Sequence, residues 1–286
     1  MEASKNDRLV KKFAALEDKT WFPQELLELV KDVCRLQSEV RASLAVSVDP
    51  GLGCGDMEHR QGAPLLAREQ FPVDAEGAEK LFRAILEVAE SLPQLRTTAQ
   101  LVRDKLIRGD IRPEELFRAY MLENAEPFEA WAKEAPDAPN LLPFLVYNSM
   151  EGEALSSAYP QNDVWQHGHC PVCGSPAFIG HLSGPEPSRN EGRDINKGGK
   201  RMHTCSYCRT TFRAKRIQCP FCLEENEPGY QVHVCRSCKS YIKIADFREF
   251  FGRESIPALD DLESLPLDIA AQNEDFHRVA PSERGL

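Results

Sequence analysis

The sequence Cys170-Pro-Val-Cys173 is the first of four Cys-x-x-Cys pairs, which continue as Cys205-Ser-Tyr-Cys208, Cys219-Pro-Phe-Cys222 and Cys235-Arg-Ser-Cys238. Eight of the ten cysteines of the chain lie in these pairs. A two-residue gap lets both thiolates of a pair turn inward over a tight loop, so two pairs complete a tetrahedral site. The four pairs therefore predict two four-sulfur metal sites.

A disulfide framework is the alternative interpretation of these cysteines. The first residues, Met1-Glu-Ala-Ser-Lys-Asn-Asp-Arg8, contain no apolar run that could serve as a secretion signal. We therefore expect the reducing cytoplasm, where disulfides are rare. Disulfides within the pairs would close only very small loops, whereas metal binding to a short peptide contributes about 10–16 kcal/mol to folding. These arguments favour metal.

The spacing between the pairs suggests how they combine, since the gaps are 31, 10 and 12 residues long. Residues 230–234, Tyr-Gln-Val-His-Val, alternate with a period of two, as in a strand that delivers Cys235 to its site. Residues 178–182 predict another strand, and the Gly/Pro/Ser/Asn-rich residues 183–199 predict a long hairpin loop. We predict sequential pairing, first with second and third with fourth. Crossed pairing of the first pair with the third is the alternative.

The composition, 42% hydrophobic and 28% charged over 286 residues, is typical of a soluble protein with more than one domain. No stretch approaches 18 apolar residues, so we expect no membrane span. Residues 164–250 contain 13 Lys+Arg and 8 Asp+Glu, whereas the remainder contains 22 and 37. This overall acidity argues against a nucleic-acid-binding surface.

Residues 1–160 predict an all-helical domain. Apolar residues recur at helical spacing in residues 5–17 and after Trp21-Phe22-Pro23, then from Asp74, which is a suitable cap. Further helices are expected after Pro93 as far as Gly109, from Pro113, from Pro127 and over residues 141–156. The Gly-rich residues 47–72 predict a long loop or surface excursion.

The predicted fold class is therefore α+β. It consists of an all-helical domain (1–160), two tandem rubredoxin-like or zinc-ribbon units (161–214 and 215–250), and a C-terminal helix and tail (251–286). The predicted metal ligands are Cys170, Cys173, Cys205, Cys208, Cys219, Cys222, Cys235 and Cys238.

The remaining candidates receive no metal role. Cys34 lies among apolar helical residues, and Cys54 with His59 would make at best half a site. Four histidines are surplus to two sites that cysteines already complete, namely His167, His169, His203 and His233. The basic residues 209–217 predict a strand face beside anionic metal–thiolate clusters, with nucleic-acid binding as the weaker alternative. The sequence contains no nucleophile elbow, phosphate loop or dinucleotide fingerprint, so we predict no enzyme.

The motifs resemble those of the formate dehydrogenase accessory protein family, FdhE. The resemblance rests on the four pairs in their context, on Cys238-Lys-Ser-Tyr-Ile-Lys243, and on Leu259-Asp-Asp-Leu-Glu-Ser-Leu-Pro-Leu-Asp268. It covers about residues 165–275. Two features depart from the family's pattern: Thr210-Thr-Phe212 stands where the family has Thr-Glu-Trp, and residues 183–199 form a polar insertion.

The resemblance implies a cytoplasmic maturation factor that binds the catalytic subunit of a molybdenum or tungsten formate dehydrogenase before export. It implies two rubredoxin-like sites, and four thiolates suit iron and zinc equally. A redox protein or sensor that uses an iron site, and a nucleic-acid-binding zinc ribbon, remain the alternative functions.

The charge asymmetry suggests how such a client is held. An acidic surface would attract the cationic start of a twin-arginine signal region and raise its association rate. We expect Asp260, Asp261 and Asp268 of the C-terminal helix to contribute to that surface together with the helical domain. We expect exposed knuckle aromatics to contact the client's folded surface, namely Tyr207, Phe212, Phe221 and Tyr241.

Overall fold

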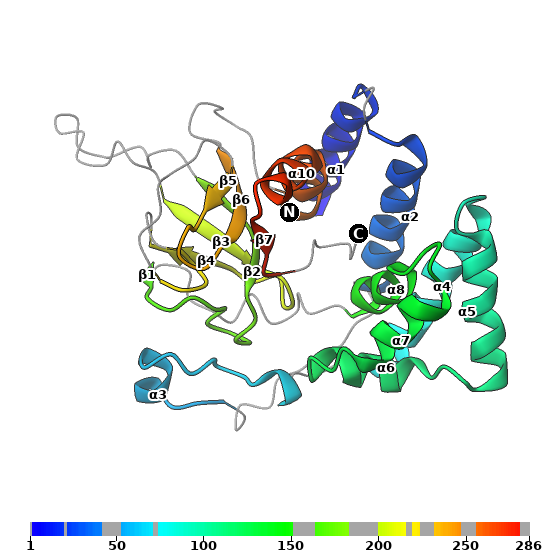
Figure 1. Cartoon of the computed structure of the whole chain (residues 1–286), viewed down its shortest axis with the longest axis horizontal. Coiled ribbons are helices and arrows are strands. Elements are labelled where there is room, and N and C mark those ends of the chain that lie inside the picture. The colour runs from blue at the N-terminus through cyan, green and yellow to red at the C-terminus, as the bar shows by residue number, and fades with distance from the viewer. Residues whose placement is uncertain are drawn as a thin grey trace. The chain divides into compact units, whose positions relative to one another are not determined.

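The computed structural model describes residues 2–19, 22–41, 53–70, 74–150, 164–182, 200–215, 219–223, 232–246 and 256–280, which form two compact units. The first unit contains the described residues up to 41 and those from 74 to 150. The second contains residues 53–70 and the described residues from 164 onward. The predicted α+β class is confirmed, with a helical N-terminal part and two groups of four cysteines in the C-terminal half (Figure 1). The finer division of the chain at residues 160, 214 and 250 stays a prediction.

The first unit is helical, and its helices begin and end at the signals visible in the sequence. They are α1 (Glu2–Glu17), α2 (Gln24–Arg41), α4 (Ala75–Ser91), α5 (Arg96–Arg108), α6 (Pro113–Met121), α7 (Glu126–Glu134) and α8 (Leu141–Ser149). Asp74 caps α4 by accepting a hydrogen bond from the Gly77 N–H at 2.9 Å. Gly109 ends α5 in the left-handed conformation, with φ of 78°. The helix expected to continue to residue 156 is described only as far as Ser149, where α8 ends.

The core of the first unit forms where α4 packs against α2, α5 and α8. One face of α4 is buried because its apolar residues recur every three or four positions, as at Leu81, Ile85 and Ala89. Nearly all of α8 is buried, since its residues are apolar on every side. None of the helices that the structure describes combines the length and the apolar character needed to cross a bilayer.

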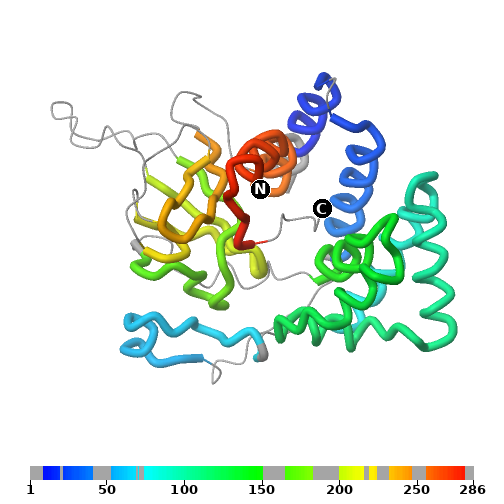
Figure 2. Tube along the Cα trace, viewed as in Figure 1, coloured from blue at the N-terminus to red at the C-terminus, as the bar shows by residue number. Residues whose placement is uncertain are grey.

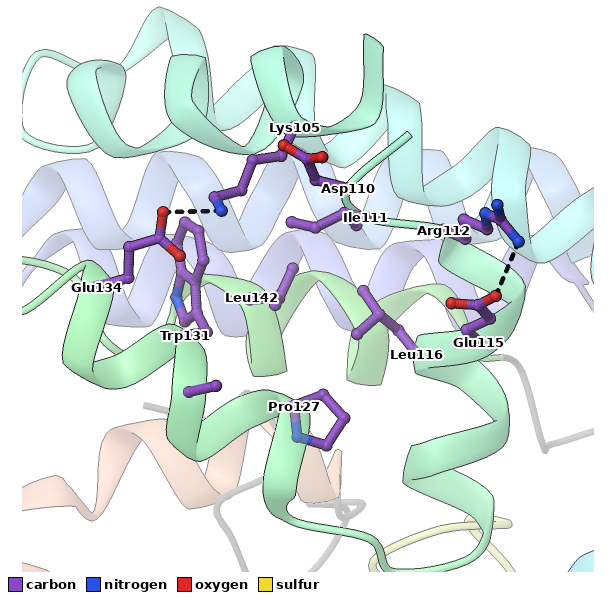
Figure 3. A pocket seen from close by; sticks show the side chains of 11 residues that line it. Lys105, Asp110, Ile111, Arg112, Glu115, Leu116, Pro127, Trp131, Glu134 and Leu142 are labelled. Atoms are coloured by element: carbon purple, nitrogen blue, oxygen red, sulfur yellow. Dashed lines mark hydrogen bonds and ion pairs between the residues drawn. The ribbon is translucent and has the colours of Figure 1, made fainter. Parts of the chain in front are cut away.

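A pocket of about 270 Å³ lies in the first unit among residues of α5, α6, α7 and α8 (Figure 3). Its walls are largely apolar, with Trp131 facing Leu142 and Leu116 (Figure 3). Each charged residue that lines it takes part in an ion pair, and these pairs are Lys105–Glu134 at 2.7 Å, Arg112–Glu115 at 3.1 Å and Arg108–Asp110 at 3.0 Å. The residues that line this pocket therefore contain no unopposed acid or base.

The second unit is built on one mixed sheet. Its strands are β1 (Val164–Trp165), β2 (Ala177–Leu182), β3 (Arg201–Cys205), β4 (Thr211–Ala214), β5 (Val232–Val234), β6 (Ser240–Asp246) and β7 (His277–Arg278). The strand order is β1-β4-β3-β2-β6-β5, and β7 pairs with β6. The hairpin β3/β4 and the hairpin β5/β6 are antiparallel, as expected for strands joined by a short knuckle. The predicted loop at residues 183–199 lies outside the described residues.

Strands β2 and β6 pair in parallel, and this pairing joins the two cysteine-bearing halves. Gly180 of β2 lies opposite Ile244 on one side and His203 on the other. A Cβ at Gly180 would come within 2.6 Å of Ile244 Cδ1 and 2.9 Å of His203 Cδ2. Because Gly180 has no side chain, the side chains of Ile244 and His203 can occupy the space above it. The two predicted ribbon units thus share one sheet.

A buried ion network fastens the C-terminal helices α9 (Pro257–Glu263) and α10 (Leu265–Asn273) to this sheet. Lys243 Nζ on β6 lies 2.7 Å from Asp261 Oδ1 and 2.6 Å from Asp268 Oδ2. Arg278 on β7 donates to the same two carboxylates, at 2.6 Å and 3.3 Å. The Tyr241 hydroxyl donates to Asp268 Oδ1 at 2.7 Å. Two cations thus neutralise two carboxylates in a largely buried network, in which Lys243 and Asp261 are the most enclosed.

The prediction that the C-terminal aspartates form an exposed acidic surface is wrong. Asp260, Asp261 and Asp268 are only 5%, 1% and 7% exposed. Asp261 and Asp268 belong to the ion network, and Asp260 accepts a hydrogen bond from the Ile256 N–H at 2.9 Å at the start of α9. Their cationic partners come from distant strands, so the local sequence resembles a solvated helix.

The expected exposure of the knuckle aromatics is also largely wrong. Tyr207, Phe212 and Tyr241 are buried, whereas Phe221 is half-buried. The Arg68 guanidinium covers the Tyr207 ring at 4.8 Å, and Phe212 packs edge-on against His203. The three buried rings therefore pack in the core of the second unit rather than on its surface.

We expect Lys243→Met to destabilise the second unit strongly, because it leaves two buried carboxylates without their main cation. Removing one partner of a buried pair typically costs about 3–5 kcal/mol. Hydrogen exchange of the β2 and β6 amides measures the effect. Lys80→Met is the control, since it removes only the exposed helical pair with Glu76 and should leave exchange nearly unchanged. Equal protection in both variants would contradict the structural role of the network.

Candidate metal centres

Each Cys-x-x-Cys pair forms a knuckle, by which we mean the turn that carries both cysteines and the residue after them. That residue has a positive φ in all four knuckles: 78° at Gly174, 59° at Arg209, 65° at Leu223 and 55° at Lys239. Only glycine adopts this conformation readily, so the three larger residues store strain on the order of 1–3 kcal/mol each. The knuckles therefore persist because the surrounding sheet and sulfur atoms hold them.

Backbone N–H groups inside the knuckles point at sulfur. The N–H groups of Val172, Tyr207 and Phe221 donate to the sulfur two residues earlier, at 3.4, 3.3 and 3.4 Å. Hydrogen bonds to sulfur favour its ionised form. The turn thus aims the cysteines inward and places an N–H donor on one sulfur atom in each of these three pairs.

The sulfur atoms gather in two groups that follow the sequential pairing. The first sulfur group contains Cys170, Cys173, Cys205 and Cys208, and the second contains Cys219, Cys222, Cys235 and Cys238. Within each group all sulfur atoms lie within 4.8 Å of one another. The measured S···S distances are 3.6 and 3.4 Å in the first group, and 3.8 and 3.5 Å in the second.

These distances fit a tetrahedral metal ion. Four sulfur atoms about 2.3 Å from a central ion lie about 3.8 Å from one another, whereas a disulfide bond is about 2.05 Å long. Each group could therefore hold one metal ion, and a set of four thiolates suits zinc and iron alike. The role of the eight cysteines as ligands stays a prediction.

The thiols within a group differ in acidity. Burial raises the pKa of Cys170 and of Cys205 well above the ordinary value. Burial acts in the same direction on Cys173, but interactions with the neighbouring cysteines of the group bring its pKa well below the ordinary value. In the second group burial is likewise opposed at Cys235, where hydrogen bonds from the Cys238 backbone and from Cys222 lower the pKa to about 7.

A buried cation lies near the second sulfur group. Arg201 on β3 is 1% exposed, and its Nη1 donates to the Lys215 carbonyl at 3.4 Å. Burial lowers the pKa of the guanidinium to about 10, while Cys219 favours the charged form. Four thiolates around a divalent ion carry a net charge of −2, so a cation at this position would stabilise the loaded site.

The segment of residues 53–70, predicted as a loop or surface excursion, lies against the first knuckle (Figure 2). It contains α3 (Asp56–Arg60) and a 3₁₀ turn, η1 (Arg68–Gln70). The N–H groups of Leu65 and Leu66 donate to the carbonyls of Pro171 and Val172 at 2.9 and 2.8 Å. We call residues 53–70 the cover segment. Its apolar Pro64-Leu65-Leu66, in otherwise polar surroundings, is the sequence signal that could have indicated a buried edge.

The surplus histidines beside the first knuckle contact the cover segment. His169 Nε2 lies 2.7 Å from the Gly62 carbonyl, and His167 Nε2 lies 3.3 Å from that of Arg60. The His59 ring stacks on Trp165 at 4.8 Å, and the Trp165 indole donates to the His169 carbonyl at 2.6 Å. These histidines therefore connect two distant parts of the second unit.

The other candidates also remain outside the sulfur groups. His203 and His233 are buried within the sheet at 1% and 4% exposure. Cys34 is half-buried in the first unit, and the Cys54 thiol lies 3.7 Å from the Ala63 carbonyl. Among the described residues, neither cysteine and no histidine joins either group.

Comparison with known proteins shows where this arrangement occurs. No family model matches the chain. A protein FdhE homolog from Pseudomonas putida is 32% identical over 167 residues, which are 50% of this chain and 47% of that protein. Another FdhE homolog, from Aquifex aeolicus, is 29% identical over 130 residues, which are 42% of this chain and 42% of that protein. The match spans less than half of the length of these two relatives.

A solved structure extends the likeness to the whole fold. The crystal structure of the FdhE protein from Pseudomonas aeruginosa superposes with a TM-score of 0.60 at 22% identity, covering 96% of this chain and 92% of that one. The chain thus resembles FdhE proteins in part of its sequence and in its fold. The sequence resemblance to FdhE is thereby confirmed.

We expect Cys219→Ser combined with Cys222→Ser to remove one metal equivalent from the protein. The first sulfur group has four sulfur atoms of its own and should keep its ion. Metal content per chain, measured by elemental analysis of the purified variant, tests this. Loss of both equivalents would show that the groups depend on each other or share ligands.

We expect His167→Ala combined with His169→Ala to leave the metal content intact, because these rings contact carbonyl groups rather than sulfur. The same change should loosen the cover segment and raise hydrogen exchange at the amides of Leu65 and Leu66. Loss of a metal equivalent would instead identify one of these histidines as a ligand.

Proposed function

We propose that this protein belongs to the FdhE family, holds two metal ions, iron or zinc, and acts as an accessory protein without catalytic activity of its own. The eight cysteines of the two sulfur groups are the proposed ligands. The observation that carries this proposal is the pair of four-sulfur groups with tetrahedral spacing on one sheet. Four protein ligands complete each coordination shell, which leaves no position for a substrate.

The proposed client is the catalytic subunit of a molybdenum- or tungsten-containing formate dehydrogenase. The protein would bind it in the cytoplasm and assist its assembly before export. The names of the relatives support an association with formate dehydrogenase through the FdhE family. The metal ions would act by holding the knuckles in place, so that the second unit presents a rigid surface.

The acidic character of the chain supports the proposal that it attracts the signal region of its client. The C-terminal aspartates are buried, but the carboxylates of Glu114, Glu115, Glu126 and Glu129 are exposed on α6 and α7. These side chains would attract the cationic start of a twin-arginine signal region. Attraction of this kind weakens as salt shortens the screening length to about 8–10 Å.

Affinity purification of the tagged full-length protein from its native cell tests partner and metal on one sample. We expect the catalytic subunit of formate dehydrogenase to co-purify, together with two metal equivalents per chain. As a matched control, association is measured at low salt with two purified forms of the client subunit, one with and one without its signal region. The form without the signal region should associate more slowly. Recovery of two metal equivalents without any formate dehydrogenase subunit would refute the client assignment.

A further inference from the structure

We infer that the two sulfur groups exchange metal at different rates. The second group would give up its ion to small chelators quickly, whereas the first would release its ion slowly. This inference rests on the proposed metal binding and concerns only which group is accessible.

The two groups have the same donor atoms and similar spacing but different exposure. Cys170, Cys173, Cys205 and Cys208 are at most 2% exposed. In the second group Cys219 and Cys235 are equally buried, at 1% and 2%, but Cys222 and Cys238 are only half-buried. Among the described residues, two cysteines of the second group and none of the first are therefore partly exposed to an incoming ligand.

The knuckle tips, the two residues between the cysteines of a pair, show the same difference. In the first group the tip residues Pro171, Val172, Ser206 and Tyr207 are all buried. In the second group Arg236 and Ser237 are exposed, Phe221 is half-buried, and Leu223 after the pair is 40% exposed. Only Pro220 is buried like its counterpart Pro171.

The cover segment accounts for the enclosure of the first group. Leu65 and Leu66 hydrogen-bond to the tip carbonyls of the first pair, and Arg68 lies over Tyr207 in the tip of the second pair. Pro64 also lies against Gly174, at 3.4 Å from the position of a Cβ on that glycine. The cover segment thus contacts both knuckles of the first group.

Exchange at an accessible group requires no change of oxidation state. The nitrogen or oxygen donors of the chelator form bonds to the ion while the cysteine–metal bonds break one after another. Each released thiolate either remains ionised or takes a proton from water. At the first group the cover segment would have to open before a chelator could enter, and local opening of a hydrogen-bonded segment slows exchange.

Zinc transfer from the zinc-loaded full-length protein to 4-(2-pyridylazo)resorcinol tests the inference. We expect two phases of one equivalent each. The rate constants of the two phases should differ by about tenfold or more, since opening the cover segment breaks two backbone hydrogen bonds. Iodoacetamide added after the fast phase, followed by peptide mass spectrometry, should label Cys219, Cys222, Cys235 and Cys238 while the other four remain protected.

Variants of the cover segment assign the slow phase. Leu65→Pro combined with Leu66→Pro removes both N–H donors and should accelerate the slow phase alone. Arg68→Ala should act in the same direction. Met57→Ala is the matched control in the same segment, because its side chain is 75% exposed, and it should change neither phase.

The outcomes separate this inference from the proposed function. A protein that binds two zinc ions but releases them in one phase, or that is labelled first at Cys170, Cys173, Cys205 and Cys208, overturns the inference and leaves metal binding intact. A protein that binds no zinc or iron under any loading condition overturns the proposed function itself. Two phases with fast labelling of the second group, and a slow phase that responds to the Leu65/Leu66 variant, support the inference.

Discussion

The parallel pairing of β2 with β6 is the interaction on which the second unit depends. Each cysteine-bearing hairpin can form from neighbouring residues, but this ladder joins strands about 60 residues apart and stabilises the fold only once both are in place. It positions Gly180 beneath the side chains of neighbouring strands and brings Lys243 to the centre of the sheet. The buried carboxylates of α9 and α10 can then be neutralised. Without the parallel pair, two small hairpins would have no common core.

Sequence analysis predicted the features that depend on local spacing. The Cys-x-x-Cys pairs predicted the two sulfur groups and their sequential order, and Asp74, Gly109 and Pro113 marked helix boundaries. Features that depend on distant partners were not predictable in this way. Asp261 and Asp268 resemble residues of a solvated helix in the sequence, because the lysine and arginine that neutralise them lie on β6 and β7. The cover segment was read as a loop because its partner carbonyls lie about 100 residues further along the chain.

The two sulfur groups provide an internal comparison within one chain. Both use a hairpin whose knuckle ends in a residue with positive φ, and both bring four sulfur atoms to tetrahedral spacing. They differ in their surroundings, since among the described residues the cysteines of the first group are all buried, whereas two of the second group are only half-buried. The residues around a group, rather than its four sulfur atoms, therefore set how exposed it is. Inspection of the ligand pattern alone would treat the two groups as equal.

The cover segment also has a consequence for biosynthesis. It leaves the ribosome about 100 residues before the knuckle that it encloses, at a pace of about 5–20 residues per second. The cover segment has therefore already been synthesised when the cysteines of the first sulfur group emerge, and it then only has to dock against them. An ion would enter most rapidly in the interval between emergence and docking, because later entry requires the cover segment to open. The identity of the metal in the first group would then record which ion was available during synthesis, rather than which ion binds most tightly at equilibrium.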